Sequence, residues 1–144
     1  MKVRVMVTVA VLVAVAVLGC TFKSRNPPTS KSLQVSMDEV LKRSAVTQNV
    51  TLAVGNTLTV SLGSNYTTPY RWKPNMTIGD STVVKQTDHS FVQPTIDALG
   101  APGSEVWRFT ALKPGTTTVT TSYSSFIGHD TTPKCTYTAT VTVQ

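Results

Sequence analysis

Few side chains in this sequence could take part in catalysis or hold a metal. Its two histidines, His89 and His129, each stand beside an aspartate, but neither belongs to a spaced ligand set such as HExxH or CxxC. We interpret both as ordinary surface or loop residues. The sequence therefore predicts no metal site and no cofactor.

Cys135 is the strongest candidate nucleophile, because a thiolate can attack a carbonyl carbon. It opens a stretch, residues 135–143, in which every second residue is apolar and the others are threonine. That position predicts a buried thiol without an activating base, which behaves as a small core hydrophobe. With no GxSxG motif, phosphate-binding glycine loop or suggestively spaced carboxylate pair either, we predict no catalytic residue and a protein that is not an enzyme.

The charged residues argue against a nucleic-acid partner. The formal net charge is +6, but the 13 lysines and arginines form no run and no basic helix face. Two of these cations, Lys2 and Arg4, stand before a Val/Ala/Leu run that ends in "VLGC". This beginning has the charge, length and small residues of a secretion signal, and its apolar run is shorter than the roughly 20 residues of a membrane-spanning helix.

The ending "VLGC" resembles a bacterial lipobox, in which the cysteine is lipidated and the signal is cut before it. The resemblance predicts a signal in residues 1–19, a lipid on Cys20 and an extracytoplasmic protein anchored to a membrane of the bacterial envelope. An ordinary signal peptide with a chance cysteine is the alternative. A lipidated Cys20 would leave Cys135 without a partner, so we expect no intrachain disulfide.

The elements that must position any functional residue are predicted to be strands. Residues 20–32 are polar, contain Pro27-Pro28 and read as a flexible tether. Ser36 is suited to cap a single helical turn from Met37, with Glu39 in its first turn. Apolar residues then recur at every second position in four stretches: Val50, Leu52 and Val54; Leu58, Val60 and Leu62; Trp107, Phe109 and Ala111; and Cys135 to Val143. This period of two predicts an all-β sandwich or barrel over residues 33–144.

Three loops between these strands stand out: "GSNYTTPYRW", "DALGAPGSEVW" and "YSSFIGHDTTPK". Loops held by a rigid sandwich are common binding surfaces, whereas Gly, Pro, Asn and Thr can also simply make turns. Composition alone leaves both interpretations open.

The same segments resemble the chagasin family, inhibitors of papain-like cysteine peptidases. "VGNTLTVSLGSNYTTPYRW" is similar to the family's strand, its Asn-Pro-Thr-Thr-Gly loop and the following tryptophan. "LGAPGSEVWRFTALKPGTTTV" is similar to its glycine-rich second loop and the strand and turn that follow. The resemblance implies an immunoglobulin-like β-sandwich and inhibition by occlusion, with three loops in or beside the peptidase cleft. The binding residues that it implies are Asn65, Tyr66, Thr67, Thr68, Pro69, Trp72, Gly100, Ala101, Pro102, Gly103, Ser125 and Phe126.

The sequence departs from the family pattern at two places. Tyr66 stands where the family has the loop proline, and Pro69 stands where it has glycine. In the third loop Ser125, Phe126 and Ile127 replace Arg-Pro-Trp, so Phe126 could supply part of the anchor while no arginine is expected nearby. Our leading hypothesis is a monomeric, membrane-anchored inhibitor of papain-like cysteine peptidases. The alternatives are an envelope lipoprotein whose loops bind a non-peptidase partner, for adhesion or exclusion, and a purely structural envelope module.

Overall fold

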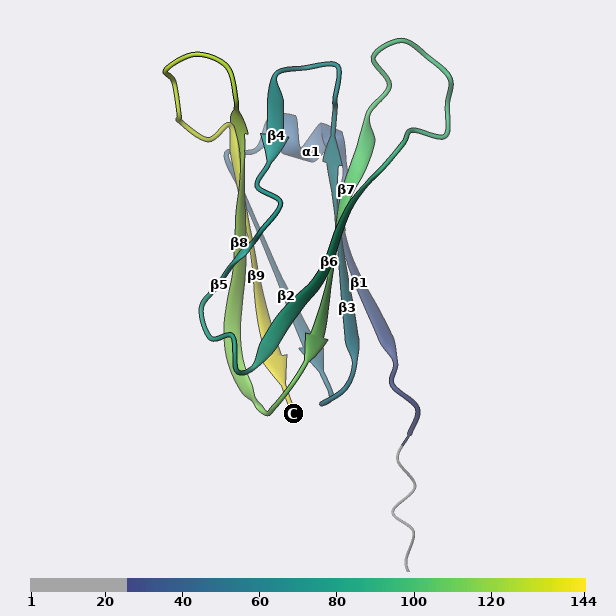
Figure 1. The fold of residues 1–144 in the computed structure, drawn as a ribbon, viewed down its shortest axis with the longest axis vertical. Helices are drawn as coiled ribbons and strands as arrows, with labels where there is room; N and C mark the ends of the chain where they lie inside the picture. The colour runs from purple at the N-terminus through teal and green to yellow at the C-terminus, as the bar shows by residue number, and fades with distance from the viewer. Residues whose placement is uncertain (1–25) are drawn as a thin grey trace, which may run out of the picture.

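The computed structural model describes residues 26–144, which form two β-sheets packed face to face with one short helix at one end (Figure 1). The first sheet has the order β1-β3-β7-β6, with β1 Ser30–Val35, β3 Thr57–Ser64, β7 Gly103–Ala111 and β6 Val84–Val92. The second has the order β2-β9-β8-β4, with β2 Ala45–Leu52, β9 Cys135–Val143, β8 Gly115–Ser125 and β4 Tyr70–Trp72. The short strand β5, Thr77–Ile78, also pairs with β8. The predicted all-β sandwich is thus confirmed.

The core lies between the two sheets and follows the alternation of the sequence. In β9 buried and half-buried residues alternate along all nine positions, so Cys135 faces the core and the threonines face outward. Trp107 and Phe109 of β7 meet Tyr123 of β8 and Tyr137 of β9 in the same core. Large aromatic side chains bury much apolar area each, and these four dominate the space between the sheets.

The predicted helix start is confirmed in α1, Met37–Lys42. Ser36 Oγ accepts a hydrogen bond from the Glu39 N–H at 3.3 Å, and Glu39 Oε2 accepts one from the Ser36 N–H at 3.4 Å. These reciprocal bonds form a capping box, which satisfies two amides that have no partner within the helix. Val40 is buried, so this face of α1 closes one end of the sandwich.

Two expectations about the first strands need correction. The strand β1 begins at Ser30, so the last three residues of the predicted tether 20–32 belong to the fold. They pair in parallel with β3 through backbone atoms while their side chains stay exposed, which leaves no apolar periodicity to detect. Val54 does not share the buried face of Leu52, because β2 ends at Leu52 and Val54 lies half-exposed in the following turn. The predicted signal and Cys20 lie outside the described residues.

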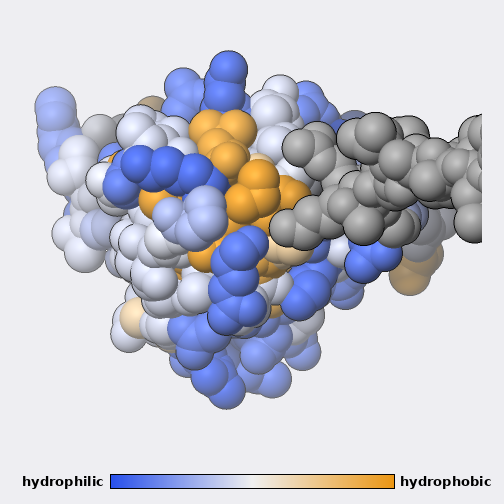
Figure 2. Space-filling view, turned by 90° about the horizontal axis from the view of Figure 1, so that it is seen from below, coloured by the Kyte–Doolittle hydropathy of each residue, from blue (hydrophilic) through white to orange (hydrophobic). Residues whose placement is uncertain are grey.

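The two ends of the sandwich differ in what they carry. Three long loops and α1 lie at one end, and the C-terminus and the start of the described chain leave from the other (Figure 1). Figure 2 shows apolar surface gathered on this second end. Val54 and Leu112 are exposed in the turns that follow β2 and β7. The Gly55 N–H donates to Ala111 O at 2.8 Å and joins the two turns. Over residues 26–144 no helix has the length and apolarity needed to cross a bilayer.

Candidate functional site

The site expected from the sequence is the end of the sandwich where three connections meet. We call residues 65–69, between β3 and β4, the first loop; residues 93–102, between β6 and β7, the second loop; and residues 126–134, between β8 and β9, the third loop. Pairing of β3 with β7 and of β4 with β8 brings the three loops to one edge (Figure 1). We call this edge the loop edge.

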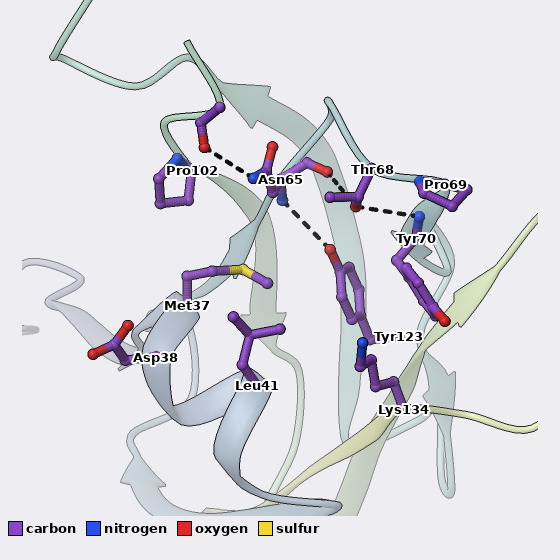
Figure 3. A pocket seen from close by; sticks show the side chains of 11 residues that line it. Met37, Asp38, Leu41, Asn65, Thr68, Pro69, Tyr70, Pro102, Tyr123 and Lys134 are labelled. Carbon is purple, nitrogen blue, oxygen red and sulfur yellow. Dashed lines mark hydrogen bonds between the residues drawn. The ribbon is translucent and has the colours of Figure 1, made fainter. Parts of the chain in front are cut away.

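Asn65 organises the first loop and joins it to the second. Its Oδ1 accepts hydrogen bonds from the Thr67 N–H at 3.0 Å and from Thr67 Oγ1 at 2.7 Å. Its Nδ2 donates to the carbonyl oxygen of Gly100 at 3.0 Å. The Thr68 hydroxyl donates to the Asn65 carbonyl at 2.8 Å (Figure 3). Side-chain bonds of this type substitute for backbone bonds in tight turns, and here they fix the loop conformation.

Not every residue expected to bind a partner is accessible. Tyr66, Thr67 and Pro69 are exposed, and Thr68 is half-buried. Trp72, in contrast, is buried, and its Nε1 donates to the Gly63 carbonyl at 2.9 Å. Trp72 therefore supports the first loop from beneath and does not reach the surface.

The glycines of the second loop have different roles. Gly100 has φ of +77°, which favours glycine, and a methyl group there would meet open space. Gly103 already belongs to β7, and a methyl group there would collide with the Val92 carbonyl and the Phe91 ring. Gly103 is thus required for strand packing, whereas Gly100, Ala101 and Pro102 remain on the loop edge.

Exposed apolar side chains occur on all three loops. Phe126 and Ile127 of the third loop are 64% and 62% exposed, and Ser125 steadies them by accepting from the Ile127 N–H at 3.1 Å. The second loop exposes Ile96 and Leu99, which the sequence reasoning did not select although they are apolar residues in a glycine-rich loop. Exposed apolar side chains that gather on one part of a domain are typical of an interaction surface.

The expectation that no arginine lies near Phe126 is wrong. Arg71 of β4 is paired with Ser124 of β8, which places it at the base of the third loop. Its Cζ atom lies 5.1 Å from the centroid of the Phe126 ring and 3.9 Å from that of Tyr66. Arg71 was missed because the strand pairing, and not the sequence order, brings it there.

A buried carboxylate lies beneath the first loop. Glu105 of β7 is 1% exposed; its Oε1 accepts from Ser64 Oγ at 2.9 Å and from the Trp72 N–H at 3.4 Å. Its Oε2 lies 2.9 Å from His89 Nε2. The interpretation of His89 as a surface or loop residue is therefore wrong, since it lies in β6 and contacts Glu105, whereas His129 is exposed in the third loop as predicted.

A cavity of about 450 Å³ opens between α1 and the loops (Figure 3). Tyr123 lies at its inner side and accepts a bond from the Asn65 N–H at 3.5 Å. Lys134 stands at its rim, with Nζ 4.6 Å from the centroid of the Tyr70 ring. The cavity is lined by Met37, Asp38, Leu41, Asn65, Thr68, Pro69, Tyr70, Gly100, Pro102, Tyr123 and Lys134. Its mainly apolar wall suits an apolar side chain of a binding partner.

The titratable groups give no sign of catalytic activation. Burial raises the pKa of the Cys135 thiol, which keeps it protonated and weakly nucleophilic. The pKa of Tyr66 is raised by partial burial and by the charge of Glu105, and Arg71 opposes this rise. Within residues 26–144 no three His, Cys, Asp or Glu side chains gather as metal ligands.

Comparison with known proteins gives one family and one fold. Residues 51–141 match the model of the chagasin family peptidase inhibitor I42. No curated protein matches significantly. Among solved structures, the cysteine protease inhibitor EhICP2 from Entamoeba histolytica is similar, with 18% identity, 83% of this chain and 100% of that chain covered, and a TM-score of 0.62. PbICP-C, solved in complex with falcipain-2, is also similar, with 21% identity, 79% of this chain and 99% of that chain covered, and a TM-score of 0.58.

Proposed function

This chain belongs to the chagasin family of peptidase inhibitors, and on that premise we propose that its loop edge inhibits papain-like cysteine peptidases by occluding the substrate cleft. The first loop, with Thr67 and Thr68, would lie over the catalytic cysteine and histidine of the peptidase. The second and third loops would flank it. The protein performs no chemistry of its own in this proposal.

The observation that carries the proposal is the order of the first loop at the centre of an apolar edge. Asn65 holds this loop through bonds to Thr67, Thr68 and Gly100, so little conformational entropy remains to be lost on binding. Arg71 Cζ lies 3.9 Å from the centroid of the Tyr66 ring and 5.1 Å from that of the Phe126 ring. Aromatic and arginine side chains commonly dominate the energy of protein interfaces.

The test is titration of papain and cathepsin L with the purified chain. We expect inhibition at micromolar concentration or below, and loss of inhibition in Thr68→Arg, because a long charged side chain at this half-buried position would disorder the loop. Thr118→Arg is the matched control, since Thr118 is exposed on β8 away from the loop edge.

The variant Tyr66→Pro, Pro69→Gly, which restores the family residues, separates two failures. If it inhibits and the natural chain does not, the loop edge has an inhibitory shape and the two departures abolish inhibition of these peptidases. If neither inhibits at micromolar concentration, occlusion of these peptidases is contradicted.

A second candidate function keeps the loop edge and changes the target to another envelope protein or a polysaccharide. It is favoured by the two departures in the first loop and by Ser125, Phe126 and Ile127 in place of Arg-Pro-Trp. Pull-down from cell envelopes with the Thr68→Arg variant as control tests it. Capture of a non-peptidase partner that Thr68→Arg abolishes would favour this function over inhibition.

We also propose that a lipid on Cys20 anchors the protein to the outer side of a bacterial membrane. The sequence "VLGC" supports this, and so does the start of the described chain at the end opposite the loop edge, which would leave the loops free (Figure 1). Mass spectrometry of the N-terminal peptide from the native host is the test. An unmodified Cys20, or a bridge from Cys20 to Cys135, would contradict the anchor.

A further inference from the structure

We propose that Arg71 is a positioning residue, whose guanidinium group holds the backbone of the first loop and ties this loop to the third. The inference deepens the proposed function and rests on it for its effect on inhibition. Arg71 acts through the loops that it holds, since it lies at their base in β4. Its effect on loop order can be measured without any peptidase.

The first support is the set of hydrogen bonds that Arg71 makes. Its Nη1 donates to the carbonyl oxygens of Thr68 and Tyr70, both at 2.7 Å, and its Nη2 donates to that of Tyr66 at 3.0 Å. These carbonyls lie on both sides of Pro69, which has no N–H to donate. One side chain therefore binds two carbonyls of the first loop and the carbonyl that begins β4. It adds to the backbone bond in which the Phe126 N–H donates to the Pro69 carbonyl at 3.0 Å.

The second support is the absence of a competing partner for the charge. In the part of the chain that the structure describes, no ion pair includes Arg71. Its half-buried guanidinium group is directed to carbonyl oxygens and aromatic rings. Hydrogen bonds from a charged donor are stronger than those between neutral groups. The charge of Arg71 therefore stabilises the loop conformation by strengthening its hydrogen bonds to these carbonyls.

The third support is a stack of side chains that crosses the loop edge. The Phe91 and Tyr66 rings stack with centroids 3.7 Å apart and planes at 13°. Arg71 lies over the Tyr66 ring, and the Phe126 ring follows at 5.1 Å. Phe91 ends β6 before the second loop, Tyr66 belongs to the first loop and Phe126 to the third. The stack therefore fixes elements beside all three loops relative to one another.

The chemistry of the group requires arginine at this position. A guanidinium is planar, donates in several fixed directions and stacks on aromatic faces, whereas a lysine ammonium is a compact point charge. Lysine would keep the charge, but its single nitrogen cannot bond three carbonyls and also place a planar group over the Tyr66 ring. The charge-conserving Arg71→Lys therefore separates geometry from charge.

The experiment compares the full chain with its Arg71→Lys and Arg71→Ala variants in two assays. Hydrogen exchange of the Thr67 and Thr68 amides, followed by NMR, should be at least about tenfold faster in both variants, because bonds to a charged donor contribute appreciably to order. Inhibition of papain should weaken roughly 10- to 100-fold in both. The pKa of Tyr66 should rise further in Arg71→Ala, since the guanidinium charge lowers it. The melting temperature should fall by less than about 5 °C.

The matched control is Arg108→Ala, which removes the same charge from β7 and an exposed ion pair with Asp88 far from the loops. It should leave amide exchange, the Tyr66 titration and inhibition unchanged. Natural exchange rates in both Arg71 variants would overturn the inference, as would full rescue by lysine. If the natural chain inhibits no tested peptidase, the proposed function fails for those enzymes, and the amide exchange and Tyr66 titration still decide the role of Arg71.

Discussion

Glu105 is the single residue whose loss should most damage the base of the loop edge. Its buried carboxylate accepts bonds from Ser64 and the Trp72 backbone and contacts His89. We expect Glu105→Ala to lower the free energy of unfolding by about 3 kcal/mol, because it leaves buried donors without acceptors. Urea denaturation measures the change.

The isosteric Glu105→Gln is the control, because its amide oxygen can keep the bonds from Ser64 and Trp72. We expect it to cost about 1 kcal/mol. A loss in Glu105→Ala no larger than in Glu105→Gln would contradict a structural role for these acceptor bonds.

Single residues also show where sequence reasoning ends. The exposed positions of Tyr66, Thr67 and Pro69 followed from the segment that contains them, because a polar loop between two alternating strands lies at the surface. The contact of Arg71 with Phe126 could not be predicted, since it depends on pairing between β4 and β8. The partners of Glu105 could not be predicted from the sequence for the same reason, because His89 contacts Glu105 through the pairing of β6 with β7.

At the scale of elements, the packing of α1 on β3 depends on one glycine. A methyl group at Gly63 would lie 2.5 Å from Met37 Cα, and the colliding atoms belong to backbone that cannot easily yield. We expect Gly63→Ala to lower the free energy of unfolding by about 1–3 kcal/mol, as overpacking does. Because α1 borders the cavity beside Thr68, binding at the loop edge should also weaken.

Gly79→Ala is the matched control for this prediction. Its added methyl group would meet the hydroxyls of Thr117 and Thr118 at 3.3 Å each, and these side chains can shift; the Thr118 backbone nitrogen, at 3.6 Å, is in ordinary van der Waals contact. We expect a loss below about 1 kcal/mol. Equal losses in the two variants, measured by urea denaturation, would show that contact with α1 does not set the effect.

The elements that could be predicted are those with one buried face. Strands β3, β7 and β9 alternate clearly and were identified from period two, and the capping residues Ser36 and Glu39 marked α1. Four of the six residues of strand β1 are polar and exposed, and β5 has only two residues. Such strands are formed by backbone pairing to a neighbour, which leaves little trace in side-chain pattern.

At the scale of the whole molecule, the fold places the loop edge and the start of the described chain at opposite ends (Figure 1). The first buried residue along this range is Val35, and the Thr29 N–H is bonded to Asn56 Oδ1 at 3.2 Å. The described chain therefore joins the sandwich at Thr29, whose carbonyl also accepts a hydrogen bond from the Thr57 N–H at 3.1 Å, and continues as strand β1. This arrangement predicts a sharp boundary in what the domain needs to fold.

We expect the chain shortened to residues 26–144 to keep the unfolding free energy and binding of the full chain, because the core begins at Val35. Shortening it to residues 36–144 removes β1, which buries Val35 and covers one edge of β3. This deletion should cost roughly 3 kcal/mol through lost burial and strand bonds. An uncovered β3 edge also invites pairing between molecules, so light scattering should detect self-association. Equal unfolding free energies of the two shortened chains in urea, with both chains monomeric, would show that β1 neither stabilises the sheet nor protects the edge of β3.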